Sequence, residues 1–156
     1  MNSDLGLTPD DKEFHLQVAI ALSDCQYVEF LLKHYIARAF DHVRQCLNGT
    51  LPFDYHGDQF EDTPLGGLIN TFKKLSDNRD LVTRLQTFKT RRDQLAHRAF
   101  FDKLRKEELG LPVDDPGHPL AELTSLQRDA ASLHLAVMTE YLRHFGDRVA
   151  AATTTK

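Results

Sequence analysis

An apolar residue recurs at every third or fourth position over nine helical turns of this chain, which restricts the fold more than any other feature. The series runs through Phe14, Val18, Ala21, Cys25, Val28, Leu32, Tyr35, Ala39, Val43 and Cys46. Such spacing predicts one long helix packed along its length. A helix start is predicted at Thr8-Pro9 and the two acids that follow. Threonine caps helix N-termini, proline suits the first helical position, and acids interact favourably with the positive end of the helix dipole. Gly49 predicts its end.

Three further segments carry a stripe of the same kind, at Leu65 to about Ser76, about Arg79 to Leu109, and Leu120 to Gly146. Thr63-Pro64 repeats the start signal, and residues 49–62 are predicted to be a loop. Gly66 and Gly67 weaken the second helix by about 1 kcal/mol each relative to alanine, and they favour close helix packing. No alternating run flanks a hairpin dipeptide, so no strand is expected. The prediction is an all-α, up-and-down bundle of four main helices.

The length of 156 residues predicts a single helical domain, 1–156, with flexible ends at about 1–7 and 150–156. Cys25 and Cys46 share the first predicted helix, roughly 31 Å apart at 1.5 Å per residue, so they cannot pair within one chain. Unpaired thiols favour a reducing compartment. No apolar run approaches the ~18 residues of a membrane span, and the acidic start is unlike a signal peptide. The expected location is the cytoplasm.

The third predicted helix differs from the rest of the chain in charge. Between Arg79 and Lys106 there are nine basic residues and three acids, a local charge of +6 in a chain whose net charge is −4. A basic element on an acidic protein indicates a polyanion site. The alternative is a solvated helix face that pairs with acidic neighbours in space.

The usual signatures of nucleotide hydrolysis, dinucleotide redox chemistry and zinc catalysis are absent. One loop holds several potential metal ligands, but their spacing fits no template and predicts a solvated polar loop. They are Asp54, His56, Asp58, Glu61 and Asp62. No metal and no cofactor are therefore expected.

Within the basic segment, Arg92-Asp93 is followed by His97, with Leu95-Ala96 before the histidine and Phe100 after it. This run resembles the Arg-x4–6-His motif of the HEPN superfamily. The preceding stretch at 63–69, Thr-Pro-Leu-Gly-Gly-Leu-Ile, is similar to the helix that often precedes that motif. The resemblance covers about residues 63–101. It implies a HEPN-like bundle that forms a homodimer, with the motifs facing each other across a two-fold axis.

The residue types suit metal-independent RNA cleavage. His97 would transfer the proton of the 2′-hydroxyl, and Arg92 would hold the phosphate. Asp93, four residues before His97, shares its helix face and would orient the imidazole. The further residues expected to contact RNA are Lys89, Arg91 and Arg98. The leading hypothesis is an endoribonuclease or RNA-binding homodimer, as in a toxin or defence component controlled by a protein partner or antitoxin.

The motif spacing alone has low specificity, because Arg128 and His134 fit the same loose pattern. We interpret that second pair as structural. The rival hypothesis is a non-catalytic interaction or regulatory domain, such as a HEPN scaffold or a mannitol-repressor-like protein. Four apolar residues of the first helix lie off its stripe and indicate burial on two sides or a partner chain. They are Leu16, Ile20, Leu22 and Leu31.

Overall fold

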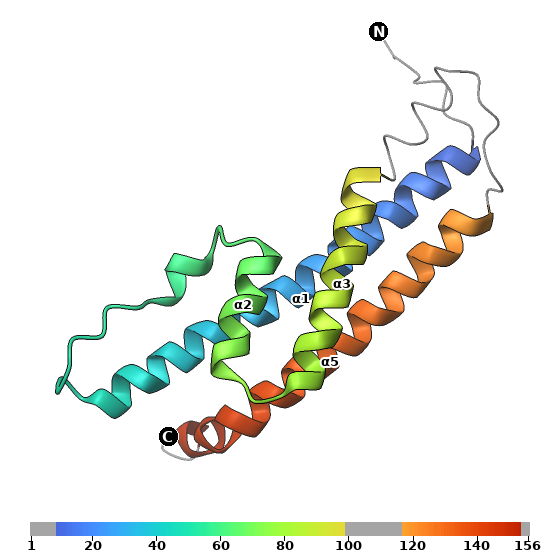
Figure 1. The fold of residues 1–156 in the computed structure, drawn as a ribbon. Coiled ribbons are helices and arrows are strands. Elements are labelled where there is room, and N and C mark those ends of the chain that lie inside the picture. The colour runs from blue at the N-terminus through green and yellow to red at the C-terminus, as the bar shows by residue number, and fades with distance from the viewer. Residues whose placement is uncertain (1–8, 99–116, 154–156) are drawn as a thin grey trace, which may run out of the picture.

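The computed structural model describes residues 9–98 and 117–153 (Figure 1). Its elements are α1 (Pro9–Leu47), a short 3-10 helix η1 (Gly57–Phe60), α2 (Leu65–Leu75), α3 (Arg79–Arg98) and α5 (Gly117–Thr153). No strand occurs in these two ranges. The prediction of an all-α fold with four main helices is confirmed.

The four helices are arranged as two pairs. α1 and α5 lie side by side, and the α2–α3 hairpin packs across them (Figure 1). Gln127 donates a hydrogen bond to Gln17, and Tyr141 stacks on His34, so α1 and α5 run in the same direction. The first and last helices of an alternating four-helix bundle are antiparallel, so the predicted up-and-down order is wrong. The cause is the 48–64 connection, which leads the chain back along α1 before α2 begins.

The end of α1 lies where its sequence predicts. The helix ends at Leu47, and Asn48 and Gly49 follow with positive φ angles of 41° and 76°. The Asn48 N–H still bonds to the carbonyl of Arg44 at 3.1 Å. Glycine reaches positive φ without steric cost, which is why it terminates helices so often.

The core lies between the two helix pairs and is built from the predicted stripes. On α1 the buried members of the stripe are Val18, Ala21, Cys25, Val28, Leu32, Tyr35 and Ala39. The fully buried Tyr35 ring joins three helices, because its centroid lies 4.8 Å from that of Phe72 on α2 and 5.4 Å from that of Phe145 on α5. Burial of each large side chain stabilises the fold by about 1.5–3 kcal/mol, so this stripe holds the pairs together.

The α2–α3 hairpin is tight at both ends. A Cβ on Gly66 would lie 2.8 Å from Cε of Lys89 on α3, which agrees with the close packing expected there. At the turn, Asn78 Oδ1 accepts the Leu81 N–H at 3.1 Å and so caps α3. The Asn78 N–H in turn bonds to Ser76 Oγ at 3.1 Å.

Two predicted boundaries need correction. The predicted loop at 49–62 contains η1, where a Cβ on Gly57 would lie only 2.6 Å from Cβ of Ala37. α5 does not end at Gly146 but continues to Thr153. One glycine costs a helix only about 1 kcal/mol, and the adjacent Phe145 is anchored in the core. Of the expected flexible ends, 150–153 are helical, whereas 1–7 and 154–156 lie outside the described residues, as does the predicted third helix beyond Arg98.

Cys25 is buried and Cys46 is exposed on α1, and both are free thiols, as predicted. Among the described helices, none combines the length and the apolar character that a membrane crossing requires.

Candidate functional site

The predicted motif begins near the end of α3, where Asp93 accepts hydrogen bonds from two basic neighbours. Lys89 Nζ lies 2.6 Å from Asp93 Oδ2, and Arg92 Nη1 lies 3.2 Å from Asp93 Oδ1. The Lys89 bond, more than the one from Arg92, holds the pKa of Asp93 below its ordinary value of 3.8. Asp93 is therefore ionised at neutral pH and already engaged by two cations.

Arg92 also reaches across to α1. Its Nη2 lies 2.9 Å from Glu29 Oε1, an ion pair whose angles do not make a hydrogen bond. The Glu29 side chain is 16% exposed and that of Arg92 is 31% exposed. Beneath the pair, burial raises the pKa of Cys25 to about 12, so this thiol is neutral. Arg92 thus ties α3 to α1, and its charge is balanced by two carboxylates.

The next basic residue makes a similar link to α5. Arg91 Nη1 pairs with Asp129 Oδ2. Two turns earlier on α3, Arg84 Nη2 donates to Ser132 Oγ at 2.9 Å. Lys89, Arg91 and Arg92 therefore each have an acidic partner, which supports the alternative that basic residues of this segment pair with acidic neighbours in space.

His97 and Arg98 belong to the last turn of α3, but their side chains lie outside the described residues. The expected Asp93–His97 contact therefore stays a prediction. The structure does bring Arg92, Asp93, Arg91 and Lys89 together on one stretch of α3.

A second polar cluster was not predicted, and it surrounds the buried Glu140 of α5, 3% exposed. Glu140 Oε1 accepts from Ser76 Oγ at 2.7 Å and from Arg143 Nη2 at 3.2 Å, while Oε2 accepts from Asn78 Nδ2 at 3.3 Å. These bonds hold the turn that caps α3 against α5. Ser76 and Asn78 lie more than sixty residues before Glu140, so no local sequence signal could have revealed these two contacts.

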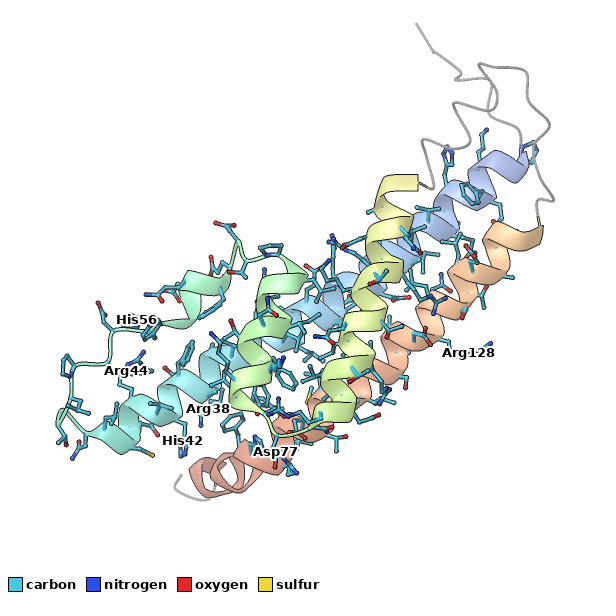
Figure 2. All side chains as sticks on the ribbon, viewed as in Figure 1. Arg38, His42, Arg44, His56, Asp77 and Arg128 are labelled. Carbon is cyan, nitrogen blue, oxygen red and sulfur yellow. The ribbon has the colours of Figure 1, made fainter. Side chains whose placement is uncertain are left out.

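The same cluster has the composition of a cation site. Ligand atoms of Asp77, Glu140 and His144 lie within 4.8 Å of one another, and Figure 2 shows Asp77 at the α2–α3 turn. Arg143 Nη2 already contacts all three, at 2.5 Å from Asp77, 3.2 Å from Glu140 and 3.0 Å from His144 Nε2. Its hydrogen bond lowers the pKa of Asp77. Arg143 therefore already supplies the positive charge that a metal ion would bring to these three side chains.

His144 completes this network through its other ring nitrogen, since Nδ1 lies 2.6 Å from the Tyr35 hydroxyl. Burial raises the pKa of Tyr35 to about 12, so the phenol is neutral. The loop that holds the other potential metal ligands is exposed. There His56 contacts Asp54 at 3.1 Å and Arg44 at 3.0 Å (Figure 2).

The outer side of the α1–α5 pair, away from α2 and α3, is apolar. On α1 four exposed large apolar side chains fall within about 80° of one another on a helical wheel. Two more lie seven residues apart on α5. They are Leu16, Ile20, Tyr27 and Phe30 on α1, and Leu135 and Leu142 on α5. We call these six residues the apolar face. Of the four off-stripe residues, Leu16 and Ile20 belong to it, whereas Leu31 is buried and Leu22 is half-buried.

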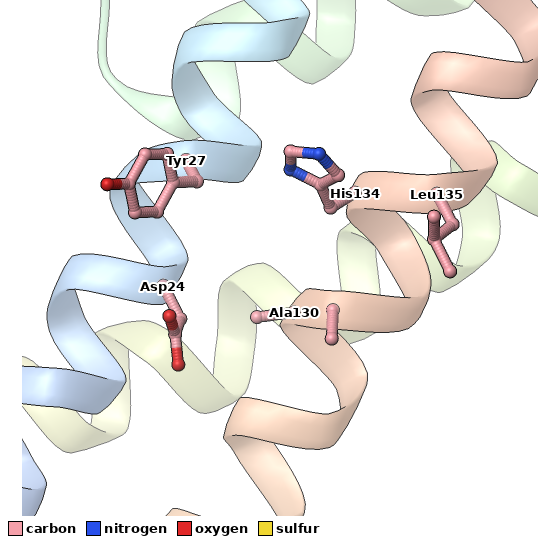
Figure 3. A pocket seen from close by; sticks show the side chains of 6 residues that line it. Asp24, Tyr27, Ala130, His134 and Leu135 are labelled. Atoms are coloured by element: carbon pink, nitrogen blue, oxygen red, sulfur yellow. The ribbon is translucent and has the colours of Figure 1, made fainter.

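A groove of about 450 Å³ runs between the two rows of the apolar face (Figure 3). Tyr27 and Asp24 border it from α1, and Ala130, His134 and Leu135 border it from α5. Ala130 has only a methyl side chain, which leaves space between the two helices at this position. His134 thus faces the groove, whereas Arg128 points away from the other helices (Figure 2), so the Arg128–His134 pair does not form a joint site.

No family profile, curated protein or solved structure matches this chain.

Proposed function

We propose that this chain is a HEPN-like helical domain whose function is to bind another protein through the apolar face. One observation carries the proposal: six large apolar side chains are exposed on one side of α1 and α5, with Phe30 63% and Leu135 67% accessible. Single exposed apolar residues are ordinary, but a contiguous group marks an interaction surface. The groove between the rows supplies the concavity that such surfaces use.

The charges of the predicted motif support this choice over catalysis. A phosphate clamp needs a cation free to meet the phosphate, whereas Arg92 is engaged by Glu29 and Asp93. Each of these carboxylates would repel a phosphate and would have to be displaced first. The contacts of Arg92 instead hold two helices together, as expected for a structural residue.

Site-specific photo-crosslinking in the cells that make the protein tests the interaction. We expect a photo-reactive phenylalanine analogue in place of Tyr27 to give one dominant protein adduct. The same analogue in place of Thr87, exposed on α3, serves as the matched control and should give none. Adding Leu135→Asp should abolish the adduct at position 27. Equal labelling from both positions would refute the proposal.

The second candidate is a metal-independent endoribonuclease or RNA-binding domain. It rests on the Arg92–His97 sequence motif, to which the hydrogen bond from Arg92 Nη1 to Asp93 Oδ1 at 3.2 Å adds a contact between two motif residues. Its test is cleavage of structured RNA with and without EDTA, comparing the wild type with His97→Ala. Cleavage that survives EDTA, leaves a cyclic phosphate and is lost in the variant would establish it. Unchanged RNA in both samples leaves the interaction domain as the better proposal.

A further inference from the structure

Three side chains of metal-binding types converge where the α2–α3 turn meets α5. Ligand atoms of Asp77, Glu140 and His144 lie within 4.8 Å of one another, and among the described residues no other three such side chains do so. Glu140 and His144 share a helix face, and Glu140 Oε1 lies 3.7 Å from His144 Nε2. Ligands of a tetrahedral zinc ion are roughly 3.3–3.6 Å apart, given metal–ligand bonds of about 2.0–2.2 Å. The spacing of this pair is close to that of two zinc ligands.

At the centre of this group lies one nitrogen of Arg143, and it has more acceptors around it than hydrogens. Nη2 lies 2.5 Å from Asp77, 3.2 Å from Glu140 and 3.0 Å from His144 Nε2. An Nη atom of arginine carries two hydrogens, so it can serve only two of the three acceptors fully at one time. Asp77 and Glu140 also bring two negative charges against the single positive charge of Arg143. A divalent cation at this position would match all three acceptors and both carboxylate charges.

The ring of His144 is held in the tautomer that a metal ion needs. Arginine only donates hydrogen bonds, so the contact between Arg143 and His144 Nε2 requires a bare lone pair on Nε2. The ring hydrogen then lies on Nδ1, which is 2.6 Å from the Tyr35 hydroxyl. Tyr35 accepts this bond and donates its own hydrogen to the Leu75 carbonyl at 3.4 Å. Histidines that bind metals show the same arrangement, with one nitrogen bare and the other hydrogen-bonded to the protein.

We infer that Asp77, Glu140 and His144 bind one Zn²⁺ ion, which takes the position of Arg143 Nη2. Imidazole nitrogen favours zinc over magnesium and calcium, which prefer oxygen ligands. Arg143 is half-exposed and solvent screens its ion pairs, so it leaves the group at little cost. A cavity of about 400 Å³, lined by Arg143 and His144, adjoins the group and has room for a water molecule as fourth ligand. Local spacing could not predict the site, because Asp77 lies more than sixty residues before the other ligands.

The bound ion joins the α2–α3 turn to α5. Asp77 belongs to the turn (Figure 2), and the other two ligands belong to α5. Glu140 is already ordered by hydrogen bonds from Ser76 and Asn78, so zinc binding orders chiefly the exposed side chain of Asp77. An ion that binds the folded chain and not the unfolded one stabilises the fold. This role is independent of the proposed interaction function and can be tested without a partner protein.

Calorimetric titration of the purified full chain with ZnCl₂, after dialysis against EDTA, tests the inference. We expect one ion per chain and an unfolding temperature that rises with zinc, whereas Mg²⁺ should not compete. Asp77→Asn and His144→Gln should each weaken zinc binding about tenfold or more, since even the loss of an outer-shell partner costs 10–100-fold. Asp58→Asn, an exposed carboxylate on η1, is the matched control and should bind zinc as the wild type does.

Arg143→Gln distinguishes a metal site from a network of salt bridges. It removes the competing cation and keeps all three ligands, so it should strengthen zinc binding severalfold. Because Asp77 is exposed and Arg143 is half-exposed, circular dichroism should show that both variants remain folded. A wild type that binds no zinc would overturn the inference. So would zinc binding that neither Asp77→Asn nor His144→Gln weakens, because the ion would then lie elsewhere on the chain.

Discussion

At the residue scale, the most constrained side chain is Glu140, a buried carboxylate with donors on both oxygens. Ser76 and Asn78 approach it from the α3 cap, and Arg143 approaches from its own helix. Arg143 is half-exposed, and solvent screening makes its ion pair worth little. Ser76 and Asn78 therefore account for most of the stabilisation that Glu140 gives the fold. Each of them loses its hydrogen-bond acceptor, away from bulk water, if Glu140 is changed.

We expect Glu140→Gln to lower the free energy of unfolding by about 1–3 kcal/mol, because the new amide group places a donor opposite existing donors. Urea unfolding at neutral pH measures the change. Asp58→Asn, an exposed carboxylate on η1, is the control and should stay within about 0.5 kcal/mol of the wild type. Equal midpoints for Glu140→Gln and the wild type would show that the cap does not depend on the charge.

At the element scale, local sequence signals predicted the helices well and their arrangement poorly. The stripe on α1 and the Gly49 stop are local features, and both agree with the structure. The direction of α5 relative to α1 depends on how the 48–64 connection returns, which no periodicity encodes. The Glu140 cluster depends on that packing too. The motif at 92–97 could be located from sequence, but the engagement of Arg92 by Glu29, sixty-three positions earlier, could not.

Two glycines of similar sequence context should respond in opposite ways to substitution. Gly146 lies inside α5, and a Cβ there would meet only Leu142 at 3.8 Å. Gly146→Ala should therefore stabilise the protein by about 0.4–1 kcal/mol, by restricting the unfolded chain. Gly57→Ala should destabilise it by about 1–3 kcal/mol, because its Cβ would lie 2.6 Å from that of Ala37. Thermal unfolding of both variants beside the wild type tests the pair, and shifts of the same sign would contradict it.

At the scale of the whole molecule, the charge distribution separates the two proposed functions. The chain has a net charge of −4, and the described cations Lys89, Arg91 and Arg92 are balanced by acids. A protein binds nucleic acid non-specifically through unpaired cations that release counterions, which makes the affinity fall steeply with salt. Few such cations remain on this part of α3, so an interaction domain of this design should bind RNA weakly.

We therefore expect RNA binding near physiological salt to be weaker than the ~1–100 µM range of basic non-specific binders. Asp129→Asn frees Arg91 from its partner. It should therefore strengthen RNA binding severalfold and steepen the slope of log affinity against log salt by roughly 0.7–0.9, the share of one phosphate contact. Fluorescence anisotropy across a salt series measures both. Asp58→Asn changes the net charge equally without freeing an arginine, so it separates a local effect from a global one. Tight RNA binding by the wild type, with a steep salt dependence that Arg92→Ala reduces, would instead support the RNA-binding function. The contacts of Arg92 with Glu29 and Asp93 would then open when RNA binds.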